Sequence, residues 1–145
     1  ISILLKSYEV RIALECESSS LAAMRRSDKQ LVQLHQALTK MEEDILQGRI
    51  ATASDFQFHM VIAQSTGNDM FPEILQSIHF SVEKAMTMAL SITRSASQER
   101  IQKVLNEHRV IYDAIKQKDP EGARLAMRHH ISCVRQRVTD NLSDA

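Results

Sequence analysis

The sequence predicts an all-α fold, a single domain of about six helices that covers residues 1–145. Three observations support this prediction. Apolar residues recur every three or four positions along nearly the whole chain. Only 3 Gly and 2 Pro occur among 145 residues, too few to punctuate a fold of short strands and turns. Helix-capping sequences separate the periodic stretches. A chain of this length buries roughly 70% of its unfolded surface, so it needs no disulfides to fold.

The first two helices are expected on either side of Ser27. One runs from the N-terminus to about Arg26, and the three serines Ser18–Ser20 mark a place where it could kink or break. Ser27, followed three residues later by Gln30, has the form of a capping box that opens the second helix. That helix ends at Gly48, a residue suited to the left-handed conformation that terminates helices.

Four more helices are expected after Gly48. The third begins near Thr52 to Ser54 and ends at Gly67-Asn68. Asp119 followed by Pro120 is typical of a helix N-terminus, because Asp caps the helix and Pro fits its first position. The fourth, fifth and sixth helices are therefore predicted at about 69–93, 98–116 and 120–141.

Composition excludes several classes of protein. With 18 basic and 18 acidic residues the net charge is zero, which argues against binding a polyanion by bulk electrostatics. The two cysteines, Cys16 and Cys133, are too few and too far apart to form a disulfide scaffold. No apolar run approaches the ~20 residues of a membrane span, and no signal peptide is recognisable. We therefore expect a cytoplasmic protein without membrane contact. Because the chain starts within a helical pattern and without Met, we interpret it as a fragment that lacks an N-terminal part.

Asp55 and His59 form the first candidate site. They are four residues apart, so both side chains project from one face of a helix with Cβ atoms roughly 6 Å apart. This spacing suits a cation bound by a carboxylate and an imidazole. It also suits a simple Asp–His hydrogen bond, or a role of Asp55 in capping the helix N-terminus.

Two further histidines fall on apolar helix faces. His108 lies on the apolar stripe of its helix, and His130 shares the buried stripe of the last helix, whereas His129 is rotated by about 100°. His35 and His79 have no acidic or histidine partner three or four residues away on an apolar face, and both are interpreted as ordinary histidines. Burying three imidazoles and a carboxylate without partners would cost on the order of 1–3 kcal/mol each. One divalent cation would satisfy all four, and a helical bundle suits such a site. The sequence thus indicates a metal site of Asp55, His59, His108 and His130.

Several short motifs occur in a characteristic order along nearly the whole chain. They are Tyr8-Glu9-Val10-Arg11 with Glu15 and Leu21-Ala22-Ala23; Asp55-Phe56-Gln57-Phe58-His59 leading to Gly67-Asn68; Glu107-His108-Arg109-Val110-Ile111 with Ala114-Ile115; and Asp119-Pro120-Glu121-Gly122-Ala123 with Ala126-Met127 and His130. In this order the chain resembles the effector-binding (FCD) domain of the FadR branch of GntR-type transcriptional regulators, in its shorter, VanR-like form.

This resemblance implies an antiparallel helical bundle with a central cavity for a metal and a ligand. The four matching metal-ligand positions are Asp55, His59, His108 and His130, so the family pattern and the helical periodicity select the same histidine, His130. It also implies that a small organic acid binds at the metal with help from Arg11. The alternative role of Arg11 is an intrahelical salt bridge to Glu15, four residues later.

Further expectations concern cofactor and partners. Zinc is the first expectation for the metal, with nickel, manganese or iron as alternatives, because all accept mixed nitrogen and oxygen ligands. A homodimer is expected, with DNA bound only through a winged helix-turn-helix domain that these residues do not include. One rival is a dimerisation module in which the metal only pins the helices. The other is a small metal-dependent hydrolase, but no general base is recognised beside the ligands, since Glu107 is expected to point elsewhere; an enzyme is therefore not predicted.

Overall fold

The computed structural model describes residues 2–94 and 98–144, without the side chains of residues 86, 89–94 and 141–144. All regular structure in this part of the chain is helical, as the sequence predicts. The helices are α1 (Ser2–Arg25), α2 (Asp28–Leu46), α3 (Thr52–Gln64), α4 (Met70–Arg94), α5 (Gln98–Lys116) and α6 (Pro120–Asp144).

The predicted capping sequences determine where the helices begin and end. Ser27 Oγ accepts a hydrogen bond from the Gln30 amide at 3.0 Å, and Gln30 Oε1 accepts one from the Ser27 amide at 2.9 Å, which completes the capping box of α2. Gly48 and Gly67 follow α2 and α3 with φ of 72°, a conformation that is unfavourable for residues with a Cβ. The carboxylate of Asp119 caps the first turn of α6.

The expectation that Ser18–Ser20 could kink or break the first helix is wrong, because α1 is continuous through them. All three serines are buried, although successive helical residues point about 100° apart, so neighbouring helices cover α1 from several sides here. The hydroxyl of Ser18 donates to the Leu14 carbonyl within the helix, and that of Ser20 accepts from Arg124 on α6. Small side chains therefore allow close helix packing without breaking α1.

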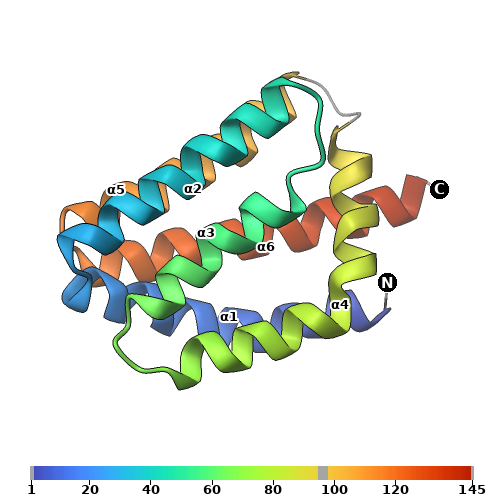
Figure 1. Cartoon of the computed structure of the whole chain (residues 1–145). Coiled ribbons are helices and arrows are strands. Elements are labelled where there is room, and N and C mark those ends of the chain that lie inside the picture. The colour runs from blue at the N-terminus through green and yellow to red at the C-terminus, as the bar shows by residue number, and fades with distance from the viewer. Residues whose placement is uncertain (1, 95–97, 145) are drawn as a thin grey trace.

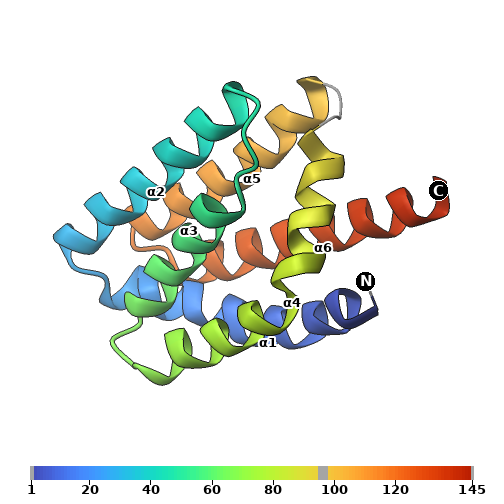
Figure 2. The same ribbon diagram turned by 45° about the vertical axis from the view of Figure 1, so that its right-hand side comes forward.

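The helices form a bundle in which α1 and α6 run side by side in opposite directions (Figures 1 and 2). α3 contacts α1, α2 and α4, and α5 contacts α1, α2 and α6. One apolar core receives side chains from every helix, including Leu4, Leu34, Phe58, Val82, Ile111 and Met127. None of the described helices is long and apolar enough to cross a membrane.

Helix α4 is bent midway along its length (Figures 1 and 2). Two side-chain hydroxyls in it donate to backbone carbonyls one turn earlier, Ser81 to Ser77 at 3.1 Å and Thr87 to Glu83 at 3.0 Å. Such bonds compete with the helical ladder and favour bending. The first half of α4 thereby lies along α1 and α3, where it covers one side of the site described next.

Candidate metal centre and adjoining pocket

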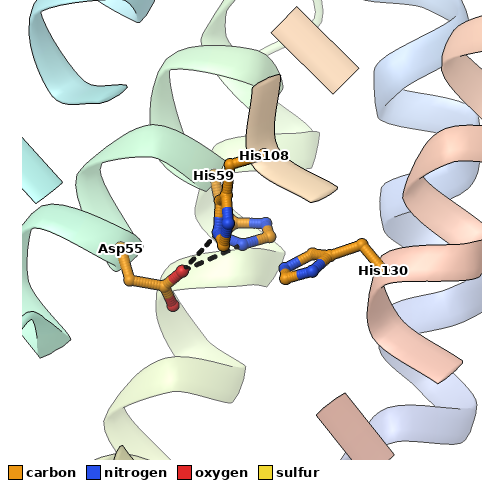
Figure 3. A group of neighbouring side chains, drawn as sticks. All are labelled: Asp55, His59, His108 and His130. Carbon is orange, nitrogen blue, oxygen red and sulfur yellow. Dashed lines mark hydrogen bonds and ion pairs between the residues drawn. The ribbon is translucent and has the colours of Figure 1, made fainter. Parts of the chain in front are cut away.

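The four residues singled out in the sequence come together in the interior of the bundle. Asp55 and His59 project from α3, His108 from α5 and His130 from α6 (Figure 3). Each offers one ligand atom, and these atoms all lie within 4.8 Å of one another. The histidines are at most 3% exposed, so bulk water does not satisfy their ring nitrogens.

Packing fixes the orientation of the three imidazole rings. The ring of Phe58 meets those of His59 and His108 edge to face, with centroids 5.7 and 5.1 Å away. The rings of His59 and His130 are stacked at 5.5 Å, and that of His130 meets the ring of His108 at 4.3 Å. The rings are therefore held by their neighbours independently of any bound ion.

Each imidazole has an acceptor at its Nδ1 atom. Nδ1 of His59 lies 2.5 Å from Glu15 Oε1, and Nδ1 of His108 lies 2.7 Å from the Val104 carbonyl oxygen. Nδ1 of His130 lies 2.8 Å from Glu107 Oε1. Because a carbonyl or carboxylate can only accept, each Nδ1 donates its hydrogen to that oxygen, and the Nε2 atoms face the centre of the cluster. Proteins use this outer hydrogen bond to orient histidines that ligate metals.

The spacing of the inner atoms fits a shared cation. Asp55 Oδ1 lies 2.9 Å from His108 Nε2 and 3.5 Å from His59 Nε2, and the latter atom is buried without a hydrogen-bond partner. Two donors that each lie about 2.1 Å from one ion, at an angle of about 90–109°, are about 3.0–3.4 Å apart. The donor set and its spacing therefore suit a divalent metal with nitrogen and oxygen ligands.

The charges in the cluster are unevenly distributed. Burial lowers the pKa of His59, but the carboxylates of Glu15 and Asp55 outweigh it and raise that pKa to about 9. Burial and the neighbouring His108 lower the pKa of His130 to about 3. Burial opposes ionisation of Asp55, yet the positive charge on His59 and the bond to His108 hold its pKa well below the usual range. The cluster thus favours one positive charge beside Asp55, which a proton on His59 or a metal ion can provide.

Arg11 forms the intrahelical salt bridge that the sequence left as an alternative. Its Nε lies 2.7 Å from Glu15 Oε2, and both side chains are buried. Arg11 nevertheless also lines a pocket beside Asp55 and His59. Glu15 therefore links the guanidinium of Arg11 to the imidazole of His59, a connection that sequence reasoning missed.

The pocket lies between the cluster and α4. Its apolar wall consists of Leu75, Ile78 and Val82, and its polar wall includes Arg11, Asp55 and His59. The empty space measures about 260 Å³, but side chains narrow it so that about one water molecule fits in the interior. A larger ligand can enter only if some of the side chains that line the pocket move.

His79 is a pocket residue that the sequence analysis treated as ordinary. Its ring stacks on Phe56 with centroids 3.7 Å apart, and its Nδ1 is buried without a hydrogen-bond partner. The only signal in the sequence was its position four and three residues from the buried Leu75 and Val82. An unsatisfied nitrogen in the pocket wall makes His79 a candidate ligand contact.

The expectation that Glu107 points away from the metal ligands is wrong in part, because its side chain is buried and contacts His130. Its carboxylate accepts from His130 Nδ1 and forms an ion pair with Arg137. It therefore supports the outer side of His130 and does not face the inner nitrogens. Helical geometry correctly separated Glu107 from His108 but gave no indication that α6 would be its partner.

Comparisons with known proteins agree with this fold. The FCD domain family model matches residues 6–132. HTH-type transcriptional regulator LutR of Bacillus subtilis (strain 168) is 27% identical over 126 residues, which are 87% of this chain and 58% of LutR. The Uxu operon transcriptional regulator of Escherichia coli (strain K12) is 30% identical over 91% of this chain and 52% of its own length. The chain thus spans about half the length of these relatives.

Two solved structures share the architecture. Streptococcus agalactiae GntR superimposes with a TM-score of 0.76 and 27% identity over 93% of this chain and 58% of that one. E. coli McbR/YncC gives a TM-score of 0.71 over 90% of this chain and 63% of that one, and at 18% identity it supports the fold alone. Together with the family match over most of the chain, these likenesses show that the chain belongs to the FCD domain family, the domain family of GntR-type regulators that its ordered motifs indicated.

Proposed function

We propose that this chain is the ligand-sensing domain of a transcriptional regulator, and that Asp55, His59, His108 and His130 hold a divalent metal at its centre. The observation on which this depends is the orientation of the three imidazoles. Each Nδ1 is engaged by an acceptor, and the Nε2 atoms share a small volume with a carboxylate. The names of the relatives, all regulators of transcription, favour sensing over catalysis.

Zinc is the first candidate for the ion, with nickel, manganese and iron as alternatives, since three imidazoles and one carboxylate suit each of them. When bound, the ion supplies positive charge and open coordination positions that attract a carboxylate. The side chains of Glu15 and Glu107 would keep two of the ligating rings in place by accepting from their Nδ1 atoms.

The effector in this proposal is a small organic acid bound in the pocket beside the cluster. Arg11 contributes a buried guanidinium and His79 an unsatisfied ring nitrogen, while α4 contributes an apolar wall. The interior of the pocket has room for only about one water molecule, far below the ~300–1,000 Å³ typical of sites for drug-sized ligands. This size favours an acid of a few carbon atoms over an acyl-CoA.

Helix α4 is the element through which binding would be transmitted. Its residues Leu75, Ile78 and Val82 line the narrow pocket, and we propose that an acid larger than water displaces them. The displacement changes the packing of α4, and we propose that it changes the geometry of a homodimer and of DNA-binding domains outside these residues. An effector can do this only through its different affinity for the two arrangements.

The two rival functions lack such support. A metal that only pins the helices would not require a buried arginine and an unsatisfied histidine in a pocket beside it. A hydrolase would need a general base near metal-bound water, and the nearby Glu107 is engaged by Arg137 on the outer side of His130. A sensing function accounts for both the buried arginine and the unsatisfied histidine, since each can bind the acid.

The test combines elemental analysis with a thermal-shift screen. Purified protein loaded with zinc is screened against mono-, di- and tricarboxylic acids of two to six carbons, since ligand binding raises the unfolding temperature by mass action. We expect one central metal per chain and stabilisation by one class of acid. His108→Ala should abolish binding of the central metal and of the acid. Arg11→Gln should lower the affinity for the acid at least tenfold while the metal remains bound. Arg135→Gln, at an exposed position on α6, serves as the control. Unchanged metal content and acid binding in His108→Ala would refute the proposal.

A further inference from the structure

A second group of metal-ligating side chains lies on the outer side of His130. Glu107 on α5 and His129 and Cys133 on α6 each offer one ligand atom, and these atoms all lie within 4.8 Å of one another. Nε2 of His129 is 3.5 Å from Sγ of Cys133, which is a free thiol. None of these three side chains belongs to the central cluster of Asp55, His59, His108 and His130.

Access and geometry distinguish this group from the central cluster. His129 is exposed and Cys133 partly exposed, so a cation from solvent can reach both without any rearrangement of the bundle. Residues four apart on a helix place their side chains on one face, and Glu107 approaches that face from the neighbouring helix. The three donors therefore surround a position at the surface of the α5–α6 interface.

The chemical types of the three donors limit which cations can bind to them. A thiolate, an imidazole and a carboxylate together suit zinc or cadmium, whereas calcium and magnesium require oxygen ligands. We propose that Glu107, His129 and Cys133 form a second site, open to solvent, for a thiophilic divalent cation. The cation forms a bond to Cys133 Sγ, and the thiol proton that it replaces passes to solvent. Water molecules complete its coordination.

Glu107 connects this site to the central one. Its carboxylate already accepts from Nδ1 of His130 at 2.8 Å and pairs with Arg137. A cation at the second site must share Glu107 with both partners, so its affinity is expected to be lower than that of a site with three free donors. By linkage, occupancy of either site then changes the affinity of the other by the same factor. The second site itself does not depend on the proposed sensing function.

The test is a cadmium titration of the reduced, zinc-loaded full chain, followed by the ultraviolet charge-transfer band of cadmium thiolate. The central cluster contains no sulfur, so this band reports a cysteine site alone. We expect the band to saturate with one equivalent of cadmium, to disappear in Cys133→Ser and to persist in Cys16→Ser. His129→Ala should lower the affinity for cadmium at least tenfold while the zinc content of the central site is unchanged.

Three results would overturn the second site. They are the absence of the band in the wild-type chain, its persistence in Cys133→Ser, and equal cadmium affinity in His129→Ala, which would indicate a lone thiol adduct. Circular dichroism confirms that each variant is folded. Retention of central zinc by Cys133→Ser separates this result from the test of the sensing function, in which loss of zinc from His108→Ala is the readout.

Discussion

Glu15 Oε1 on α1 lies 2.5 Å from Nδ1 of His59 on α3, and both side chains are buried. The same carboxylate binds Arg11 through its other oxygen. Glu15 therefore orients one candidate metal ligand and one candidate effector ligand at once. It connects the two halves of the proposed site without belonging to either.

Replacing Glu15 by Gln is expected to weaken zinc binding by about 10–100-fold, the usual effect of removing an outer partner of a ligating histidine. The variant keeps the size of the side chain but loses the negative charge that makes His59 a better donor. Zinc affinity is measured by competition with a chelating dye. Glu9→Gln, an exposed position on the same helix, is the control. If the two variants bound zinc equally well, Glu15 would have no part in the site.

Local patterns in the sequence were sufficient to predict where the helices lie and which of their faces are buried. Helix α5 spans the predicted residues, and the apolar stripe of α6 correctly separates His130, which is 2% exposed, from the exposed His129. A periodic pattern reports which side of a helix faces the core, and capping sequences report where the helix ends. That the four inward-facing polar residues bind a metal stays a prediction.

Partners distant along the chain could not be predicted in the same way. Glu15 and His59 are 44 residues apart, and Glu107 and His130 are 23 apart, so their contacts depend on how the helices pack. His79 was overlooked because its partner in the stack, Phe56, lies on another helix. Periodicity identifies the buried face of a helix but not the helix that will cover it.

Metal removal is expected to destabilise the chain. Zinc at 100 times its dissociation constant adds about 2.7 kcal/mol of stability, which corresponds to a rise of about 5–10 °C in the unfolding temperature of a domain of this size. Dialysis against a chelator should abolish the rise and zinc should restore it, as followed by calorimetry. His130→Ala should be insensitive to zinc when Cys133→Ser also removes the second site, whereas the exposed His35→Ala should respond like the wild-type chain. A zinc response that survived in the chain carrying both His130→Ala and Cys133→Ser would exclude His130 as a ligand.

Ser19 is fully buried on α1, and its hydroxyl has no hydrogen-bond partner. Ser19→Ala is expected to stabilise the chain by about 1 kcal/mol, because it removes an unsatisfied polar group and improves helix propensity. The matched control is Ser18→Ala, which deletes a hydroxyl that donates to the Leu14 carbonyl. This variant should gain less stability than Ser19→Ala. Urea denaturation measures both. A larger gain from Ser18→Ala than from Ser19→Ala would contradict this explanation.

Asp44 at the end of α2 accepts a hydrogen bond from Ser54 at the start of α3 and lies close to Lys40 and Arg49. Burial raises its pKa, but these three partners outweigh burial and lower it below 3.8. The folded carboxyl therefore binds its proton less tightly than the unfolded one, so the ionised group stabilises the fold above about pH 4 and loses this effect as the pH falls further.

Asp44→Asn is expected to cost about 1–2 kcal/mol at pH 7, most of it from the buried bond to Ser54, since exposed ion pairs contribute little. The difference between this variant and the wild-type chain should shrink as the pH is lowered below about 4, because the unfolded carboxyl then binds protons more readily than the folded one. Urea denaturation of both proteins at several pH values measures this difference. Glu43→Gln, an exposed neighbour on α2, controls for the loss of one negative charge. A destabilisation that stayed constant across this range would show that shape, and not charge, determines the role of Asp44.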